Sequence, residues 1–169
     1  MKPLMLLMLV FFIGCNESKN IISRNEVYSE AKNLTSIKSL VNIGMCAGLC
    51  VYTIQIEKTK VIFTQTNNEY AGVVREKSSE KRLEGEITDN EWEEILQLVN
   101  KTEFTLLPEN IKRPNESDCG KMLLEVNFDG GSINRIAYEC YPPPELRKLE
   151  TKLSEIRERF RKKSNQESN

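Results

Sequence analysis

Short β-like runs joined by short connections constrain the fold of this chain more than any other feature. Residues 37–43, 51–57 and 61–66 are rich in apolar and β-branched side chains, and Lys58-Thr59 forms the tight connection between the last two runs. Within 51–57 every second residue is large and apolar, which is the pattern of a half-buried strand. Because a parallel crossover needs a dozen or more residues, we expect these strands to pair antiparallel.

Two further strands are expected at 70–75 and 82–87, separated by the charged turn 76–81. The polar, proline-containing segment 109–117 is expected to be a loop.

A β-hairpin is expected at 121–141, where two β-like runs flank Asp129-Gly130-Gly131. Two registers fit the sequence. A two-residue loop would place Cys119 opposite Cys140, whereas a three-residue loop matches the apolar residues better and moves Cys140 opposite Gly120. Both registers leave the two cysteines as neighbours.

Two amphipathic helices are expected. The first begins after Thr88, because Thr88 and Glu91 have the spacing of a capping box and apolar residues follow at helical spacing. The single tryptophan, Trp92, belongs to that apolar stripe, so we interpret it as a core residue. The second helix follows three prolines, and its apolar residues are three and four apart: Leu146, Leu149, Leu153, Ile156 and Phe160. This stripe is expected to cover one face of the sheet.

Together these elements predict an α+β fold, with an antiparallel sheet of about five to seven strands packed by two helices. Residues 37–161 are expected to form a single domain. The polar segment 15–36, rich in Asn, Ser and Lys, is expected to be a flexible tether, and 162–169 a disordered tail.

Residues 1–15 indicate an address and a lipid anchor. Lys2 precedes the apolar run 4–13, which is too short to span a bilayer but suits a secretory signal. Gly14-Cys15 matches the last two positions of the bacterial lipobox, so we expect 1–14 to be a lipoprotein signal peptide and Cys15 to be lipidated. The lipid would hold the protein on a membrane of the bacterial envelope, outside the cytoplasm. An ordinary signal peptide followed by a free thiol is the alternative.

The composition excludes several classes of function. Histidine is absent, which rules out Ser/His/Asp and Cys/His catalysis and His-based zinc chemistry. The Glu residues lie mainly in charged contexts that are typical of a solvated surface, so paired-carboxylate chemistry is not favoured. With 24 basic and 25 acidic residues the chain has no strong positive field. We therefore expect no enzyme, cofactor, metal or nucleic-acid partner.

Four cysteines remain once Cys15 is set apart: Cys46, Cys50, Cys119 and Cys140. An even number in an exported chain favours disulfides, and three pairings are possible. The hairpin favours Cys119 with Cys140, which leaves Cys46 and Cys50 as a local staple. The alternative is a thiol-redox or metal site. Redox chemistry is disfavoured because three residues rather than two separate Cys46 from Cys50, and a metal site would need reduced thiolates.

At Cys46, Gly48, Cys50 and Tyr52 the chain resembles a family of uncharacterised bacterial envelope lipoproteins. These small domains of unknown function carry a Cys-x-Gly-x-Cys-Pro-x-Tyr motif before a set of strands, then a capped helix, a late hairpin and a proline-led helix. The present chain lacks the proline and has Tyr52 one position early, and the resemblance covers 37–160. It implies an envelope location and a fold of this kind, and it implies no activity, substrate or cofactor.

The expected function is therefore that of a lipid-anchored bacterial envelope lipoprotein that binds a partner or supports structure without catalysis. Its partner would be an envelope protein or ligand, and its binding patch would lie on the sheet face away from the two helices. The alternative is an envelope thiol-redox or metal-binding protein that uses Cys46 and Cys50.

Overall fold

The computed structural model describes residues 33–44, 46, 49–67, 80–112 and 119–167. All of them belong to the unit Lys32–Asn169. The strands are β1 (Leu34–Asn42), β2 (Leu49–Glu57), β3 (Lys60–Asn67), β4 (Glu80–Glu86), β5 (Asn110–Ile111), β6 (Lys121–Phe128) and β7 (Ile133–Glu139). The helices are α1 (Asp89–Asn100) and α2 (Arg147–Gln166), with short 3-10 turns η2 (Phe104–Leu106), η3 (Asp129–Gly131) and η4 (Pro144–Leu146).

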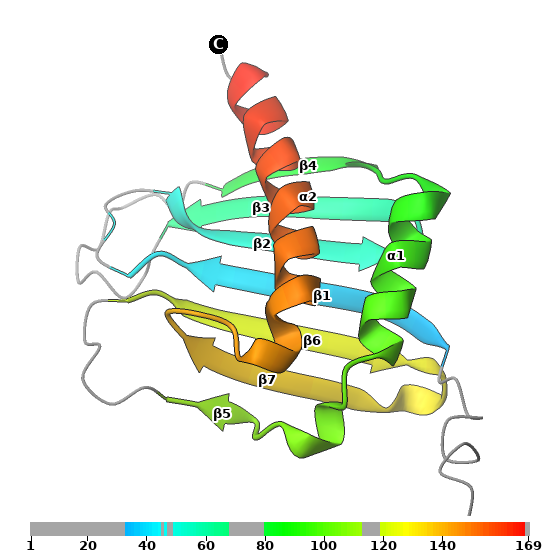
Figure 1. The fold of residues 1–169 in the computed structure, drawn as a ribbon. Coiled ribbons are helices and arrows are strands. Elements are labelled where there is room, and N and C mark those ends of the chain that lie inside the picture. The colour runs from blue at the N-terminus through cyan, green and yellow to red at the C-terminus, as the bar shows by residue number, and fades with distance from the viewer. Residues whose placement is uncertain (1–32, 45, 47–48, 68–79, 113–118, 168–169) are drawn as a thin grey trace, which may run out of the picture. The chain divides into compact units, whose positions relative to one another are not determined.

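Seven strands form one sheet in the order β4-β3-β2-β1-β6-β7-β5 (Figure 1). Neighbouring strands are antiparallel, except that β5 runs parallel to β7. Both helices lie on the same face of this sheet (Figure 1). The predicted α+β class is confirmed.

The segment 109–117, predicted to be a loop, contains the short strand β5, and this part of the prediction is wrong. The Ala137 amide donates to the Glu109 carbonyl at 2.7 Å, which aligns the segment with β7. Two residues are too few to produce an alternation that a sequence pattern can reveal. The strand predicted at 82–87 is observed as β4, whereas the one predicted at 70–75 lies outside the described residues.

Strand β1 begins three residues before the predicted strand, inside the predicted tether 15–36. Leu34 is buried, and Thr35 Oγ1 donates to the Asn127 carbonyl at 3.0 Å. The pairing with β6 shifts register between Leu34 and Ser36, which is a β-bulge. The bulge brings Leu34 into the same core as Ile37, three residues away, so Leu34 is out of phase with the alternation that predicts the strand. The predicted start of the domain at residue 37 is corrected to about residue 34.

The hairpin of β2 and β3 follows the predicted pattern. Glu57 pairs with Lys60 around a two-residue turn, in which Lys58 takes a left-handed φ of 54°. The alternate residues of β2 divide as predicted: Ile54 and Ile56 are fully buried beneath the helices, and Tyr52 packs against the core.

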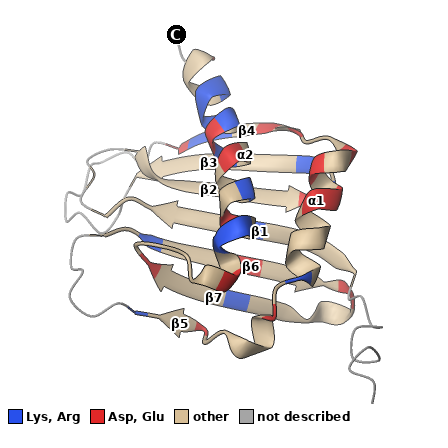
Figure 2. Ribbon diagram, viewed as in Figure 1, with Lys and Arg blue, Asp and Glu red and all other residues tan. Residues whose placement is uncertain are grey.

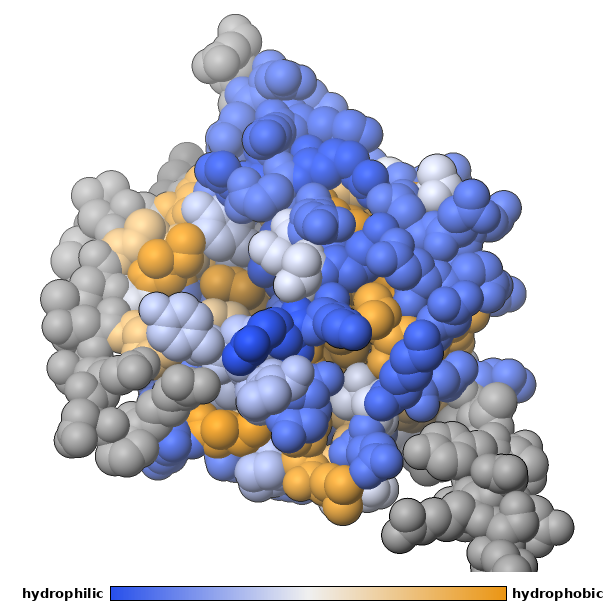
Figure 3. Space-filling view, viewed as in Figure 1, coloured by the Kyte–Doolittle hydropathy of each residue, from blue (hydrophilic) through white to orange (hydrophobic). Residues whose placement is uncertain are grey.

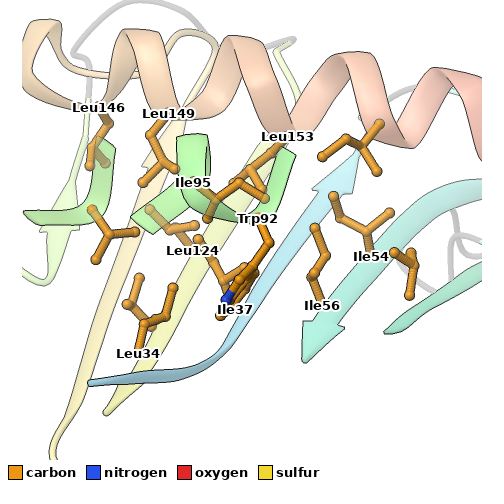
Figure 4. Close-up of a cluster of buried hydrophobic side chains, with 14 of the residues drawn as sticks. Leu34, Ile37, Ile54, Ile56, Trp92, Ile95, Leu124, Leu146, Leu149 and Leu153 are labelled. Carbon is orange, nitrogen blue, oxygen red and sulfur yellow. The ribbon is translucent and has the colours of Figure 1, made fainter. Parts of the chain in front are cut away.

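Helix α1 begins at the predicted capping box. The Glu91 amide donates to Thr88 Oγ1 at 3.2 Å, and the Thr88 amide donates to Glu91 Oε2 at 3.0 Å. Trp92 is buried and points with Ile95 toward the strands, which confirms its interpretation as a core residue (Figure 4).

Helix α2, preceded by Leu146 of η4, covers the sheet through the predicted stripe, all of whose members are buried: Leu146, Leu149, Leu153, Ile156 and Phe160. Figure 4 shows the first three of these side chains on the side of the helix that faces the strands. At the far end of the sheet, Gly85 of β4 permits this approach, because a Cβ there would lie 2.8 Å from Phe160 Cε1.

The tail predicted to be disordered from residue 162 is wrong over most of its length, because α2 continues to Gln166 and projects past β4 (Figure 1). Ser164 is buried, and Lys163 Nζ lies 5.4 Å from the centroid of the Phe160 ring. The apolar stripe ends at Phe160, so hydrophobic spacing gives no sign of these last turns.

Candidate functional site

The four described cysteines form two disulfides. Cys46 pairs with Cys50, with Cα atoms 5.9 Å apart, and Cys119 pairs with Cys140, with Cα atoms 4.9 Å apart. Cys15 lies outside the described residues, so its lipidation remains a prediction.

The Cys46–Cys50 disulfide closes the connection between β1 and β2. The Ile43 amide donates to the Cys50 carbonyl at 3.1 Å, and the Cys46 amide donates to the Gly44 carbonyl at 3.0 Å. Cys50 is fully buried, whereas Cys46 is only half-buried. Burial shields Cys50, so Cys46 is the more accessible half of this disulfide.

The hairpin of β6 and β7 adopts the three-residue register. Leu124 pairs with Ile136, and the Cys140 amide donates to the Gly120 carbonyl at 3.1 Å. The loop accommodates this register because Gly130 and its neighbour Gly131 take φ angles of 81° and 80°.

In this register Cys119 is not directly opposite Cys140, and a local turn compensates. Cys140 has a φ of 67°, and the Tyr141 amide donates to the Glu139 carbonyl at 2.8 Å. This i to i+2 hydrogen bond defines a γ-turn centred on Cys140. The turn directs the Cys140 side chain toward Cys119.

Both disulfides lie at the same end of the sheet. Asn42 ends β1 and pairs with Lys121, the first residue of β6. At Gly120 a Cβ would overlap the Asn42 carbonyl oxygen, so only glycine fits this approach. The strand ends that carry the two disulfides therefore lie directly beside each other.

We call this region the disulfide end and define it by Ile43, Cys46, Cys50, Cys119, Cys140 and Tyr141. Among these six residues, Ile43 and Tyr141 are the two with exposed side chains. In the space-filling view, apolar surface gathers at the left of the molecule, over the strand ends that carry the disulfides (Figure 3). The disulfide end is thus a cross-linked surface with apolar side chains in solvent.

The sheet face opposite the two helices, which we call the open face, carries a short apolar row. Leu40 of β1 pairs with Leu123 of β6, which pairs with Ala137 of β7, and all three are half-buried. In the next row, Lys38 pairs with Glu125, which pairs with Arg135. Arg135 Nη2 donates to Glu125 Oε2 at 2.6 Å. This face therefore offers apolar contact beside charges of both signs.

Charged side chains also line the helices (Figure 2). The sequence predicts that most of the Glu residues are solvated, but two charged side chains of α2 are largely shielded from solvent. Glu150 and Arg157 of α2 are buried against the sheet. The sequence does contain a signal for this: the two residues are seven apart and adjoin Leu149 and Ile156, so a helical projection places them beside the apolar stripe. The expectation that the Glu residues lie mainly on a solvated surface therefore does not hold for Glu150.

An ion pair between Arg159 and Glu91 joins the two helices. Arg159 of α2 donates to both carboxylate oxygens of Glu91, at 2.7 and 3.2 Å. The hydrogen bond from Arg159 lowers the pKa of Glu91 to about 2, and burial of the carboxyl opposes this shift. The carboxylate is therefore held ionised in a structural contact.

No family model matches the chain, and no match was found among curated proteins. None of the helices in the described part of the chain is long and apolar enough to cross a membrane. Within those same residues, no three His, Cys, Asp or Glu side chains come together as a metal site would require.

Proposed function

We propose that this chain is a lipid-anchored lipoprotein of the bacterial envelope whose domain lies outside the cytoplasm and binds a partner or supports envelope structure without catalysis. The pairing of the cysteines is the observation that carries the proposal. Of five cysteines, the four described ones are bonded to each other, and such disulfides persist in oxidising compartments. They leave Cys15, which follows the apolar run 4–13 and Gly14, as the residue available for acylation.

The non-catalytic part of the proposal is supported by how the buried or strongly paired carboxylates are used. Glu91 contacts Arg159 and completes the cap of α1. Glu150 contacts Arg157 beneath α2. Glu91 thus joins α1 to α2, and Glu150 joins α2 to β1 because Ser39 Oγ donates to its carboxylate. The sequence has no histidine to act as a base beside either carboxylate.

Metabolic labelling tests the anchor. The full chain, expressed in a bacterium with labelled palmitate, is expected to carry label and to sediment with membranes. Cys15→Ala is expected to lose the label and leave the membrane fraction. A chain with Cys46→Ala and Cys50→Ala serves as the matched control and is expected to keep the label. Equal labelling of Cys15→Ala and the unaltered chain would contradict the proposal.

Binding through the open face can be tested with the membrane-anchored protein. After cross-linking in cells, proteins co-purified with the unaltered chain are compared with those retained by Leu123→Lys, on the open face, and by Gln97→Lys, at an exposed position of α1. A partner that Gln97→Lys retains and Leu123→Lys loses supports the proposal. If both variants retain the same proteins, this surface is not the binding site.

The alternative function, thiol-redox or metal binding through Cys46 and Cys50, is favoured only by the partial exposure of Cys46. Mass spectrometry of the purified chain after graded reduction and alkylation separates the two proposals. Selective, reversible opening of Cys46–Cys50 by mild dithiols, or retention of bound zinc by the reduced pair, supports the alternative. Two disulfides that both resist such reductants support a structural role.

A further inference from the structure

Four polar side chains are buried together between α2 and the sheet. Ser39 comes from β1, Tyr138 from β7, and Glu150 and Arg157 from α2, and each is less than a tenth exposed. We call these four residues the buried polar cluster. Arg157 Nη2 donates to Ser39 Oγ at 2.6 Å, and Ser39 Oγ lies 3.4 and 3.5 Å from the two carboxylate oxygens of Glu150. Ser39 is therefore the residue of the sheet that both buried charges of α2, Glu150 and Arg157, contact.

The hydrogen bonds of the cluster are incomplete. Arg157 Nη2 lies 3.7 Å from Glu150 Oε2, so the ion pair is loose. Tyr138 Oη and Arg157 Nε have no hydrogen-bond partner among the described residues. Burial lowers the pKa of Arg157, which reflects the cost of removing its charge from water. For Tyr138, burial and then the charge of Glu150 raise the pKa of the hydroxyl, so it remains a neutral donor.

Such a cluster is a poor source of stability. Removing two charges from water costs several kcal/mol per ion in typical proteins, and well-packed apolar replacements are often as stable or more so. The cluster therefore needs an explanation other than the strength of its contacts.

The apolar stripe of α2 supplies one. Its residues, Leu146, Leu149, Leu153, Ile156 and Phe160, are separated by steps of three, four, three and four, so a shift of seven residues superposes most of the stripe on itself. By a seating we mean a position of α2 along the sheet. Because apolar contacts are non-directional, they alone would favour the observed seating only weakly over one shifted by seven residues. Glu150 and Arg157 contact Ser39 together only in the observed seating. Because Glu150 and Arg157 are themselves seven residues apart, a shift of seven residues would leave only one of them beside Ser39, and the other charge would lose its contact with the serine.

We propose that the buried polar cluster is a registry device that fixes where along the sheet α2 docks, at a cost in stability. The polar contacts specify one seating, whereas the apolar stripe supplies most of the favourable free energy.

An all-apolar variant tests the proposal. Ser39→Ala, Glu150→Leu and Arg157→Met, introduced together in the full chain, are expected to leave the thermal midpoint unchanged or higher. Amide signals of α2 and β1 in the 15N-labelled variant are expected to broaden or multiply, because more than one seating is populated. The matched control is Lys148→Gln with Glu155→Gln, an oppositely charged pair also seven residues apart on α2 but exposed. It is expected to change neither measurement.

Two results would overturn the proposal. If the all-apolar variant gives one sharp set of α2 signals with unaltered contacts to β1, packing alone sets the register. If it loses stability or fails to fold, the cluster holds the domain together rather than specifying it. The single variant Glu150→Leu gives an independent check, because Arg157 is then buried without its anion: a fall in thermal midpoint of about 10 to 20 °C is expected. An unchanged midpoint would contradict the proposal, because it would show that Arg157 is not held in the buried site when its anion is removed.

Discussion

The contact between Glu91 and Arg159 ties the start of α1 to α2, and its contribution should depend on pH. Glu91 has two roles: it completes the capping box with Thr88, and it accepts two hydrogen bonds from Arg159. Replacing Glu91 by Gln separates these roles, because glutamine also serves in a capping box but carries no charge.

The size of the effect follows from the pKa. A fall from 4.5 to about 2 corresponds to about 3 kcal/mol if it is converted directly. The Glu91 side chain is 18% exposed but that of Arg159 is 40% exposed, so solvent and salt screen the pair. We therefore expect Glu91→Gln to lower the free energy of unfolding by about 1 to 2 kcal/mol at pH 7 and low salt.

The pH dependence has a definite sign. Folding lowers the pKa of Glu91, so the stabilisation is fully present above the ordinary pKa of 4.5 and is lost as the pH falls through about 2. Urea unfolding at a series of pH values measures it. The difference between the unaltered chain and Glu91→Gln is expected to be constant from pH 7 to 5 and to shrink between pH 4.5 and 2.

A matched control is Glu94→Gln, which removes a neighbouring ion pair with Lys152 whose carboxylate is more exposed than that of Glu91. Its effect is expected to stay below about 0.5 kcal/mol, with little dependence on pH. If Glu91→Gln is as stable as the unaltered chain at pH 7, or if its deficit persists at pH 2, the attribution to the Arg159 pair is wrong.

Three further predictions concern packing and cross-linking. Gly85→Ala is expected to cost about 1 to 3 kcal/mol in urea unfolding, because the new Cβ overlaps Phe160; adding Phe160→Leu should cost less than the sum of the two single changes, and strict additivity would show that the two sites do not touch. Replacing Cys119 and Cys140 by alanine should lower the free energy of unfolding by roughly 3 kcal/mol, because the disulfide closes a separation of 21 residues; an unchanged denaturation midpoint would show that the hairpin holds without it. Trp92→Ala is expected to cost about 3 to 5 kcal/mol and to remove the near-UV circular dichroism of the indole, whereas a loss under 1 kcal/mol would place Trp92 outside the core.

The elements that the sequence predicts best are those with strong local periodicity. The stripe of α2, the capping box at Thr88 and the alternation of β2 all reappear in the structure. Each depends on residues within one or two turns or strand repeats, so local chemistry decides it.

The elements that the sequence misplaces depend on distant partners. Leu34 joins the sheet through a bulge against β6, and β5 exists because β7 offers it an edge. Neither feature leaves a repeat in the local sequence. The hairpin register was open for the same reason, since both loops fit the composition and the pairing across the strands selects one.

The candidate sites divide in the same way. The sequence by itself determined which cysteines are available, that histidine chemistry is excluded, and that one amphipathic helix must cover a sheet. Only the tertiary structure decided that Cys46 bonds Cys50, that both disulfides occupy one end of the sheet, and that Glu150 and Arg157 meet Ser39 beneath α2. The physical reason is range: periodicity and capping act over a few residues, whereas disulfides, strand register and buried charge pairs are set by residues brought together from distant parts of the chain.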